Sequence, residues 1–376
     1  MFRLAWKHLT CDVLRTAMTA VALASVIAVI LVLDGFEQGQ YRQLQKVIAE
    51  RHADLFAAQA GVSNFVAARS SLPQLSREAV ESVAGVVNAH PLTALPIIYK
   101  QEGKLTPVYI LVYDTRGGPG EILAGNNIRD GRDIVIDQTL AKRYGLGIGD
   151  TFVVSDFDFR VSGITDEAAF FMPFAFVNYD GMIDLFLESQ IAPDLSTFPL
   201  LSFLLIELEP GADRKAVQAA IEKGVREVDV FTPEELAAQD VGMARTFYRP
   251  IMGLLASVAW VMGLLVVGLI LYADVRGRRR NFAVMKALGF RHRHLVTVVL
   301  AQSLLLMLLA IPAGLLIAQG TTAYIHSVAP VYLIRIYEPA IFFRTILASL
   351  FLALLGALIP LRSVWRSDPM LAFQET

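Results

Sequence analysis

Residues 251–280 read IMGLLASVAWVMGLLVVGLILYADVRGRRR, in which a long uncharged apolar run is followed within a few residues by a cluster of arginines. A helix that crosses a bilayer needs about 20 mostly apolar residues. The run at 251–273 therefore predicts a transmembrane helix. Because Lys and Arg mark the cytoplasmic side of short loops, the arginines predict that this helix ends in the cytoplasm.

Three further segments have the length and apolar character of membrane spans, namely residues 17–33, 295–319 and 341–361. The last contains one charge, Arg344, which lies near enough to the end of its span to reach the headgroups. Hydrophobic residues make up 55% of the 376 residues and charged residues only 18%. The pattern predicts a membrane α-helical protein with four transmembrane helices and a large α+β extracytoplasmic domain inserted between helices 1 and 2.

Orientation follows from the basic residues of the short segments. The loop at 274–294 is rich in Lys and Arg, whereas Arg335 is the only Lys or Arg in the external loop at 320–340. Both termini are therefore predicted in the cytoplasm and the large domain in the periplasm, on a multi-pass protein of the inner (plasma) membrane. The first span could instead be a cleaved signal peptide, but Asp34, Gly35 and Phe36 offer no small-x-small cleavage site.

The segments before the first span and after the last span are short. Residues 1–16 predict a cytoplasmic amphipathic helix, because apolar side chains recur at helical spacing beside basic ones; the apolar positions are Phe2, Trp6, Leu9 and Val13. Residues 362–376 are predicted to form a cytoplasmic tail. Cys11 is the single cysteine, so an intramolecular disulfide is excluded.

The external domain is predicted at residues 34–232. Residues 34–250 contain 30 Asp and Glu against 19 Lys and Arg, and this acidic balance argues against nucleic-acid binding, which needs a basic surface. Thr232, Pro233 and Glu235 supply an N-cap, a first-turn proline and a capping-box glutamate. They predict a stalk helix at 233–250 that leads into the second span.

Residues 170–176 form the densest aromatic run outside the spans. Clustered aromatic residues are ordinary core material, so a buried strand is the first interpretation. The alternative is a candidate substrate or partner surface, formed by Phe170, Phe171, Phe174 and Phe176. The glycines at 146–154 predict a turn into a β-hairpin, because a dinucleotide-binding loop would have to follow a strand and open a helix.

The sequence contains no Walker phosphate loop, no Gly-x-Ser-x-Gly elbow and no His-Glu-x-x-His helix. His292 and His294 are two residues apart, which places them on different faces of a helix, and neighbouring Arg291 and Arg293 would repel a cation. The chain is therefore expected to be a non-catalytic membrane subunit that binds no cofactor or metal. Its energy source would be a separate partner chain.

The cytoplasmic loop divides into two parts. Its arginines are interpreted as topology-setting residues: Arg276, Arg278, Arg279 and Arg280. The segment that follows has an apolar stripe at helical spacing, and Gly289 is placed to end a short helix. Such a helix suits a groove on another protein, so we predict an ATPase-docking segment made of Asn281, Phe282, Met285, Lys286, Leu288, Gly289 and Phe290. The alternative is that the loop's charges only hold it inside.

The segment 281–290 resembles the "E-hydrophobic-A-hydrophobic-L-K/R-A-L-G" coupling helix of ABC-type permeases of the MacB/FtsX/LolC superfamily, closest to the DevC-like branch. Asn281 stands where the family usually has an acid. Four more segments resemble the family in the right order: residues 6–19, 134–164, 205–236 and 368–372. In this family the coupling helix meets the nucleotide-binding subunit.

The resemblance implies a homodimer of permeases bound to an ABC ATPase subunit dimer, with ATP and Mg on the ATPase. It implies an ATP-driven exporter that works by mechanotransmission on a periplasmic or outer-leaflet substrate, together with a periplasmic adaptor and an outer-membrane channel. Two alternatives stay open: an FtsX-like signalling subunit that regulates a cell-wall hydrolase, and LolC/E-like lipoprotein extraction. A membrane-anchored enzyme is the weakest alternative.

Overall fold

The computed structural model describes residues 10, 13–66, 69–101, 103–190, 200–277, 284–285, 289–290 and 292–365. The chain divides into two compact units. The helical unit comprises Met1–Gln38, Tyr248–Ile325 and Ile334–Thr376, and the sheet unit comprises Gly39–Phe247 and His326–Leu333. Along the chain, the sheet unit is inserted between the first and second long helices, which confirms the predicted fold class.

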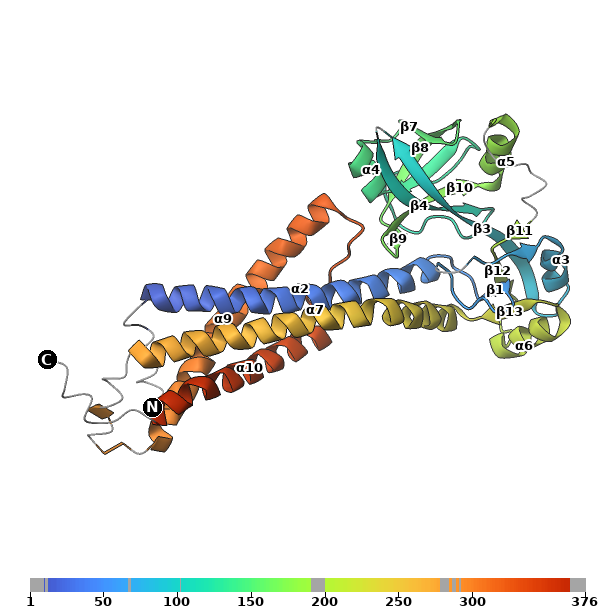
Figure 1. Cartoon of the computed structure of the whole chain (residues 1–376). Helices are drawn as coiled ribbons and strands as arrows, with labels where there is room; N and C mark the ends of the chain where they lie inside the picture. Colours follow the sequence, from blue (N-terminus) through green and yellow to red (C-terminus); the bar gives the residue numbers. More distant parts are fainter. Residues whose placement is uncertain are drawn as a thin grey trace. The chain divides into compact units, whose positions relative to one another are not determined.

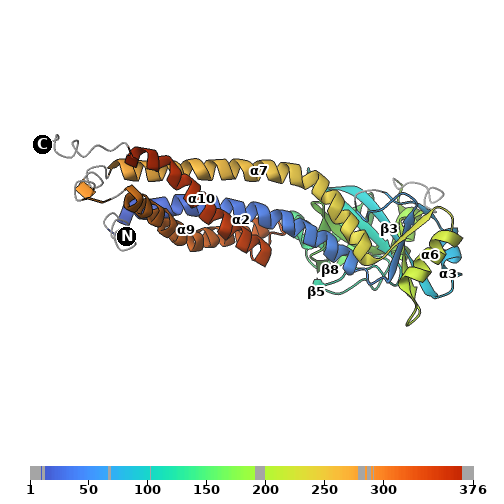
Figure 2. The same cartoon turned by 90° about the horizontal axis from the view of Figure 1, so that it is seen from below.

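Among the described residues, four helices are long and apolar enough to cross a membrane. They are α2 (Val13–Ala49), α7 (Pro233–Gly277), α9 (His292–Val328) and α10 (Pro339–Trp365). Each contains one of the predicted spans. In the helical unit, parts of all four helices share one apolar core. Figure 1 and Figure 2 show these helices from two sides.

The helices of this unit approach closely at glycines. A Cβ at Gly314 of α9 would lie 2.9 Å from the backbone oxygen of Ala24 on α2. A Cβ at Gly356 of α10 would lie 2.3 Å from a side-chain carbon of Val267 on α7. Small residues let the backbones of membrane helices approach, and these two positions therefore set the spacing of the bundle.

Polar contacts join α2 to α10 and to the segment that precedes α10. Arg344 Nη2 lies 2.6 Å from Asp34 Oδ2, and Arg335 N donates to Gly35 O over 2.9 Å. The sequence predicts that Arg344 reaches toward the headgroups. In the structure its charge also has a carboxylate partner on a neighbouring helix, which lowers the cost of placing an arginine at the end of an apolar span.

Helix α2 continues past residue 33, where the span is predicted to end, as far as Ala49. The extension is helical because Tyr41, Leu44, Val47 and Ile48 supply a second set of buried apolar residues at near-helical spacing. Helix α7 likewise continues through Pro250, from Pro233 to Gly277.

The sheet unit is built on a mixed sheet in the strand order β13-β1-β12-β3-β4-β10-β6-β8-β5, with β7 paired to β8 and β9 paired to β10. The strands are β1 (Leu55–Gln59), β3 (Val86–Gln101), β4 (Lys104–Tyr113), β5 (Ile122–Gly125), β6 (Asp133–Asp137), β7 (Thr151–Val154), β8 (Phe157–Thr165), β9 (Ala168–Ala169), β10 (Met172–Asn178), β12 (Phe203–Leu208) and β13 (Val228–Phe231). A separate pair joins β2 (Leu72–Pro73) to β11 (Leu200–Leu201).

Short helices cover the sheet and close two apolar cores. One core contains Phe152 and Phe159 beneath α4 (Gln138–Tyr144) and α5 (Tyr179–Glu188). The other contains Leu204 and Ile221 with α3 (Leu75–Glu81) and α6 (Arg214–Gly224).

Candidate functional site

The end of α2 is fixed in the sheet unit by Arg51, whose side chain has no exposed surface. Its guanidinium forms an ion pair with Glu167, which lies between β8 and β9, and Nη1 donates to Gly117 O over 2.8 Å. Nε donates to Val47 O over 3.0 Å, and the guanidinium lies 5.0 Å from the ring centre of Phe176. A buried charge is tolerated only when it is paired and hydrogen-bonded, so this set of contacts specifies one position for Arg51.

The partner side of this contact is equally constrained. Glu167 Oε1 accepts a hydrogen bond of 2.6 Å from Gly120 N. Burial raises the pKa of the Glu167 carboxyl, and the Arg51 guanidinium acts in the opposite direction. Gly117 has a φ of 92°, and a Cβ there would lie 2.7 Å from Leu205 Cδ1. The Gly-Gly-Pro-Gly loop at 117–120 is therefore required for the chain to close around Arg51.

Two further contacts hold the extension of α2 within the sheet unit. Lys46 Nζ lies 2.7 Å from Asp166 Oδ1, with both side chains partly exposed. Gln43 Nε2 donates to Val331 O, in the loop between α9 and α10, over 3.0 Å. Gln43 and Lys46 thus attach the last turns of α2, and Arg51 the residues just after it, to the sheet unit and to this loop.

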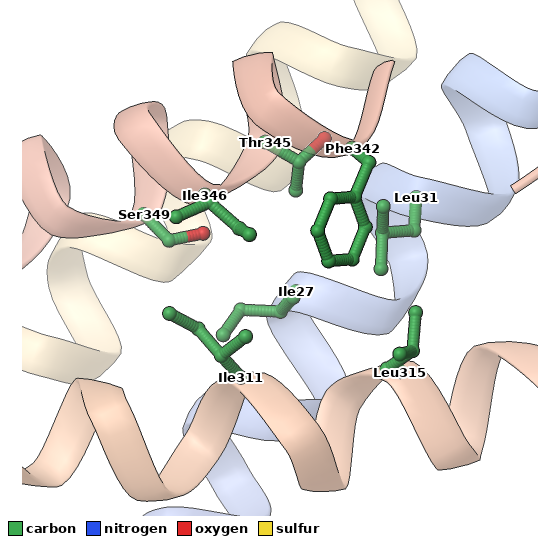
Figure 3. A pocket seen from close by; sticks show the side chains of 8 residues that line it. All are labelled: Ile27, Leu31, Ile311, Leu315, Phe342, Thr345, Ile346 and Ser349. Atoms are coloured by element: carbon green, nitrogen blue, oxygen red, sulfur yellow. The ribbon is translucent and has the colours of Figure 1, made fainter. Parts of the chain in front are cut away.

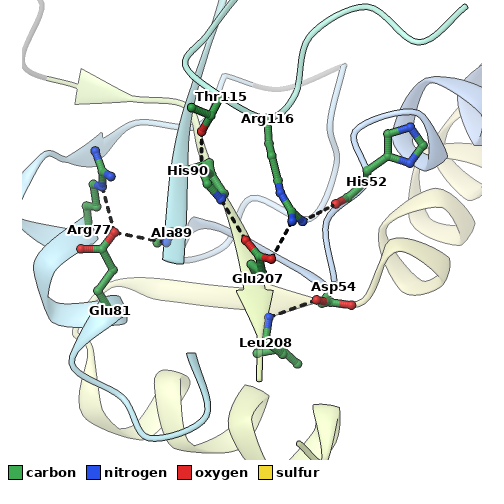
Figure 4. Close-up of polar contacts among 10 residues, drawn as sticks. All are labelled: His52, Asp54, Arg77, Glu81, Ala89, His90, Thr115, Arg116, Glu207 and Leu208. Carbon is green, nitrogen blue, oxygen red and sulfur yellow. Dashed lines mark hydrogen bonds and ion pairs between the residues drawn. The ribbon is translucent and has the colours of Figure 1, made fainter. Parts of the chain in front are cut away.

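A polar network follows α2 where the chain enters β1, as Figure 4 shows. Arg116 donates to His52 O over 3.2 Å and to Glu207 Oε1 over 2.6 Å. His90 Nε2 lies 3.4 Å from Glu207 Oε2, and His90 Nδ1 lies 2.8 Å from Thr115 Oγ1. A hydroxyl, an imidazole and a carboxylate in a row are the groups of nucleophilic catalysis. Here the imidazole is buried and Arg116 holds the carboxylate, so we interpret the network as structural.

Helix α7 is attached to the same unit. Asp240 Oδ1 accepts a hydrogen bond of 2.9 Å from Phe65 N, in the loop after β1. Arg245 lies with its guanidinium carbon 5.4 Å from the ring centre of Tyr41 on α2. The parts of α2 and α7 that belong to the sheet unit are therefore joined to each other as well as to the sheet.

The aromatic run at 170–176 divides into buried and exposed parts. Phe174 and Phe176 have no exposed surface and belong to β10 in the sheet core, so they form no part of an accessible surface. Phe170 and Phe171 lie in the turn between β9 and β10, and 36% of Phe171 is exposed. The ring of Phe171 lies 5.7 Å from that of Tyr332, in the loop between α9 and α10.

Of the predicted ATPase-docking segment, the structure describes Met285, Gly289 and Phe290. Gly289 has a φ of 87°, and Phe290 N donates to Met285 O over 3.1 Å, which is the bonding pattern of a helix that ends at a left-handed glycine. Met285 packs against the helical core. Asn281, Phe282, Lys286 and Leu288 lie outside the described residues, as do Arg278, Arg279 and Arg280, whereas Arg276 is exposed in the last turn of α7.

A small cavity lies among α2, α9 and α10 in the helical unit. Figure 3 shows its mostly apolar lining, with Thr345 and Ser349 as the hydroxyl-bearing residues. Among the residues that the structure describes, no group of three His, Cys, Asp or Glu side chains could hold a metal ion.

Arg51, Glu167 and the close contacts of the 117–120 loop are not among the features predicted from the sequence. Glycine and proline density at 117–120 was an available signal for a tight loop. The pairing of Arg51 with Glu167 had no such signal, because 116 positions of sequence separate the two residues.

Curated proteins of similar sequence match this chain almost from end to end. An uncharacterized ABC transporter permease of Mycobacterium tuberculosis H37Rv is 22% identical over 364 residues, covering 96% of this chain and 95% of the relative. An uncharacterized ABC transporter permease of Mycobacterium bovis is 24% identical over 368 residues, with the same two coverages.

Two solved structures are also similar. The extracellular domain of the noncanonic ABC-type transporter YknZ from Gram-positive bacteria is 13% identical with a TM-score of 0.34, covering 48% of this chain and 100% of that one. The periplasmic region of MacB from Actinobacillus actinomycetemcomitans is 11% identical with a TM-score of 0.36, covering 52% and 97%.

Two family models account for most of the sequence. The MacB-like periplasmic core domain matches residues 16–223, which is more than half of the chain. The FtsX-like permease C-terminal domain matches residues 253–369. The first match includes α2 and most of the sheet unit, and the second includes the other three membrane-spanning segments. The chain belongs to the MacB/FtsX family of ABC transporter permeases.

Proposed function

We propose that this permease is the membrane subunit of an ATP-driven exporter that acts by mechanotransmission on a periplasmic or outer-leaflet substrate. Two copies of the chain would work with a dimer of a separate ABC ATPase, and with a periplasmic adaptor and an outer-membrane channel. ATP and Mg would bind to the ATPase. Both termini and the loop at 274–294 would face the cytoplasm.

One observation carries this proposal: α2 is longer than a membrane span and its far end is locked into the sheet unit by Arg51 and Glu167. Its 37 residues extend about 56 Å at ~1.5 Å per residue, against ~30 Å for the hydrocarbon core. A continuous helix fixed at its end transmits an axial or lateral displacement, because it has no joint to absorb that displacement. Helix α7, with 45 residues, is a second continuous helix that runs from the sheet unit into a membrane span.

The cytoplasmic end of this machine would be the predicted docking segment. We propose that Phe282, Met285, Lys286 and Leu288 contact the ATPase, while Arg276 to Arg280 set topology. The Schellman-type end at Gly289 supports a short helix in this segment. ATP-driven closure of the ATPase dimer would displace this helix and, through α7 and α2, the two sheet units.

The test uses the full chain assembled with its ATPase. Lys286→Glu, or a proline inserted beside Ala287, is expected to abolish ATP-coupled transport while the protein still inserts in the membrane. Lys223→Glu, which reverses a charge at an exposed position of α6 in the sheet unit, is the matched control and should retain transport. Full coupled transport in the Lys286→Glu and proline variants would overturn the proposed docking role. ATP-driven movement of the sheet units with no transported substrate would favour the signalling alternative.

A further inference from the structure

The turn between β9 and β10 places two phenylalanines in a backbone conformation that suits neither. Phe170 has a φ of 49° and Phe171 a φ of 63°, while Ala169 pairs with Met172 on either side of the turn. Two-residue hairpin turns with positive φ at both central positions favour Asn-Gly, because bulky side chains crowd the left-handed region. Such strain persists where the surrounding structure holds it, and it often marks a functional position.

The strained turn brings one ring to a specific partner. The rings of Phe171 and Tyr332 lie 5.7 Å apart at an angle of 64°, within the range that favours edge-to-face attraction between aromatic rings. Glycine at position 171 would relax the turn but would remove this contact. The strained turn thus holds Phe171 in contact with Tyr332, whereas the hairpin alone would be more stable with Asn-Gly at these positions.

Tyr332 belongs to the loop that joins two membrane-spanning helices. Helix α9 ends at Val328 and α10 begins at Pro339, so this loop is covalently continuous with both helices. Tyr332 N donates to Ala329 O over 3.1 Å, which makes a tight turn, and Val331 O accepts from Gln43 of α2.

The other end of the same hairpin segment is attached to α2. Asp166 pairs with Lys46, and Glu167 pairs with Arg51, immediately before β9. Residues 166–172 thus contact α2 through their ion pairs and the α9–α10 loop through the ring of Phe171. This short segment of the sheet unit therefore contacts parts of the chain that continue into α2, α9 and α10, which are three of the four membrane-spanning helices.

We propose that Phe171 is a positioning residue that couples the loop between α9 and α10 to the sheet, and so forms a second transmission path beside α2 and α7. This inference rests on the proposed mechanotransmission. Displacement of α9 and α10 moves Tyr332, Tyr332 moves the hairpin through Phe171, and the hairpin moves β10 in the middle of the sheet.

The experiment uses the full chain with its ATPase in proteoliposomes. In a Cys11→Ser background, Leu187→Cys on the exposed side of α5 carries one nitroxide label, and the distance between the labels of two copies is measured with and without ATP. Phe170→Asn combined with Phe171→Gly converts the turn to Asn-Gly. We expect this variant to melt about 2–4 °C higher, because strain is relieved, and to lose the ATP-dependent distance change.

Three variants separate the ring contact from the turn. Phe170→Asn alone should raise the melting temperature and keep the distance change, since Phe171 and Tyr332 remain. Tyr332→Ala leaves the turn unaltered and should abolish the distance change without raising the melting temperature. Tyr332→Phe preserves the ring and should behave like the wild type.

The outcomes distinguish this inference from the function on which it rests. A wild type without any ATP-dependent distance change overturns both. A wild type that responds, with an equal response in the Asn-Gly and Tyr332→Ala variants, leaves mechanotransmission intact and refutes the role of Phe171. If the Asn-Gly variant does not fold, Tyr332→Ala and Tyr332→Phe decide the question alone.

Discussion

Arg51, just beyond the end of α2, and Glu167, between β8 and β9, form an ion pair in which neither side chain has any exposed surface. The pair joins two parts of the sheet unit that are 116 positions apart in sequence: the end of a helix that continues from a membrane span, and the loop between β8 and β9. Gly117 O and Gly120 N form further hydrogen bonds with the two side chains, and Arg51 Nε also donates to Val47 O. The end of α2 therefore has one defined position in this unit.

Breaking this pair from one side should destabilise the sheet unit strongly. Glu167→Gln leaves the Arg51 guanidinium buried without a counter-charge, which costs about 3–5 kcal/mol for a buried pair. The measurement is urea unfolding of the purified chain in detergent. The control is Glu188→Gln, which breaks the exposed pair of Arg132 and Glu188 and should leave the unfolding midpoint unchanged. Equal midpoints for the Glu167 and Glu188 variants would contradict the structural role of the buried pair.

The carboxyl of Asp137 should make stability depend on pH. Asp137 caps α4 by accepting a hydrogen bond of 2.7 Å from Thr139 N, and burial raises its pKa from 3.8 to about 7. Between about pH 4 and pH 7 the folded state holds this proton more tightly than the unfolded state does. Stability from this group is therefore full below pH 4 and is lost as the pH rises through 7.

Asp137→Asn keeps the cap, because Asn caps helices as well as Asp does, and removes the titration. The variant should gain stability relative to the wild type as the pH rises from 5 to 8, measured by thermal unfolding at each pH. Asp213→Asn at the exposed cap of α6 controls for exchanging a cap carboxylate. A difference between Asp137→Asn and wild type that does not change with pH would show that burial does not perturb this carboxyl.

Gly314 should be intolerant of even a methyl group. A Cβ there would lie 2.9 Å from Ala24 O and 3.0 Å from Ile27 Cβ, so Gly314→Ala must push α9 away from α2 at a cost of about 1–3 kcal/mol. Gly253→Ala in α7 has no atom within 4 Å of the new Cβ and should be neutral. Thermal stability of the two variants in detergent gives the comparison, and equal melting temperatures would argue against this close packing.

The start of α7 should depend on its capping box. Thr232 N donates to Glu235 Oε2 over 2.9 Å, and Glu235 N donates to Thr232 Oγ1 over 3.2 Å, as the sequence predicts. Thr232→Ala should cost about 1 kcal/mol and speed amide hydrogen exchange in the first turn of α7. Thr246→Ala removes from the same helix a hydroxyl that donates to Gly242 O, and exchange in the first turn should then stay unchanged.

The features that the sequence could predict are those specified within a few consecutive residues. The apolar run at 251–273 and the capping box at Thr232 each follow from local composition and spacing. The left-handed end at Gly289 was also expected from its place after an apolar stripe. The extension of α2 to Ala49 was not predicted, because polar residues lie between the apolar positions that begin at Tyr41 and the segment is too polar to be part of a membrane span.

The residues of the candidate site could not be predicted from local sequence in this way. Arg51 reads in the sequence as an ordinary basic residue near a helix end, and Glu167 as one acid among many in an acidic domain. Phe171 was singled out with Phe174 and Phe176, but composition could not say which of the three is exposed. Only the folded sheet distinguishes them, because it buries β10 in the core and leaves the turn before β10 at the surface.

The sequence by itself determined that the chain crosses a membrane four times and carries a large domain between its first two spans. It could do so because the bilayer imposes a length and an apolarity on each span that can be read one segment at a time. Only the tertiary structure decided how α2 is anchored. Arg51 and Glu167, like Phe171 and Tyr332, are distant in sequence, and the energy of a buried charge or ring contact depends on which surfaces folding brings together.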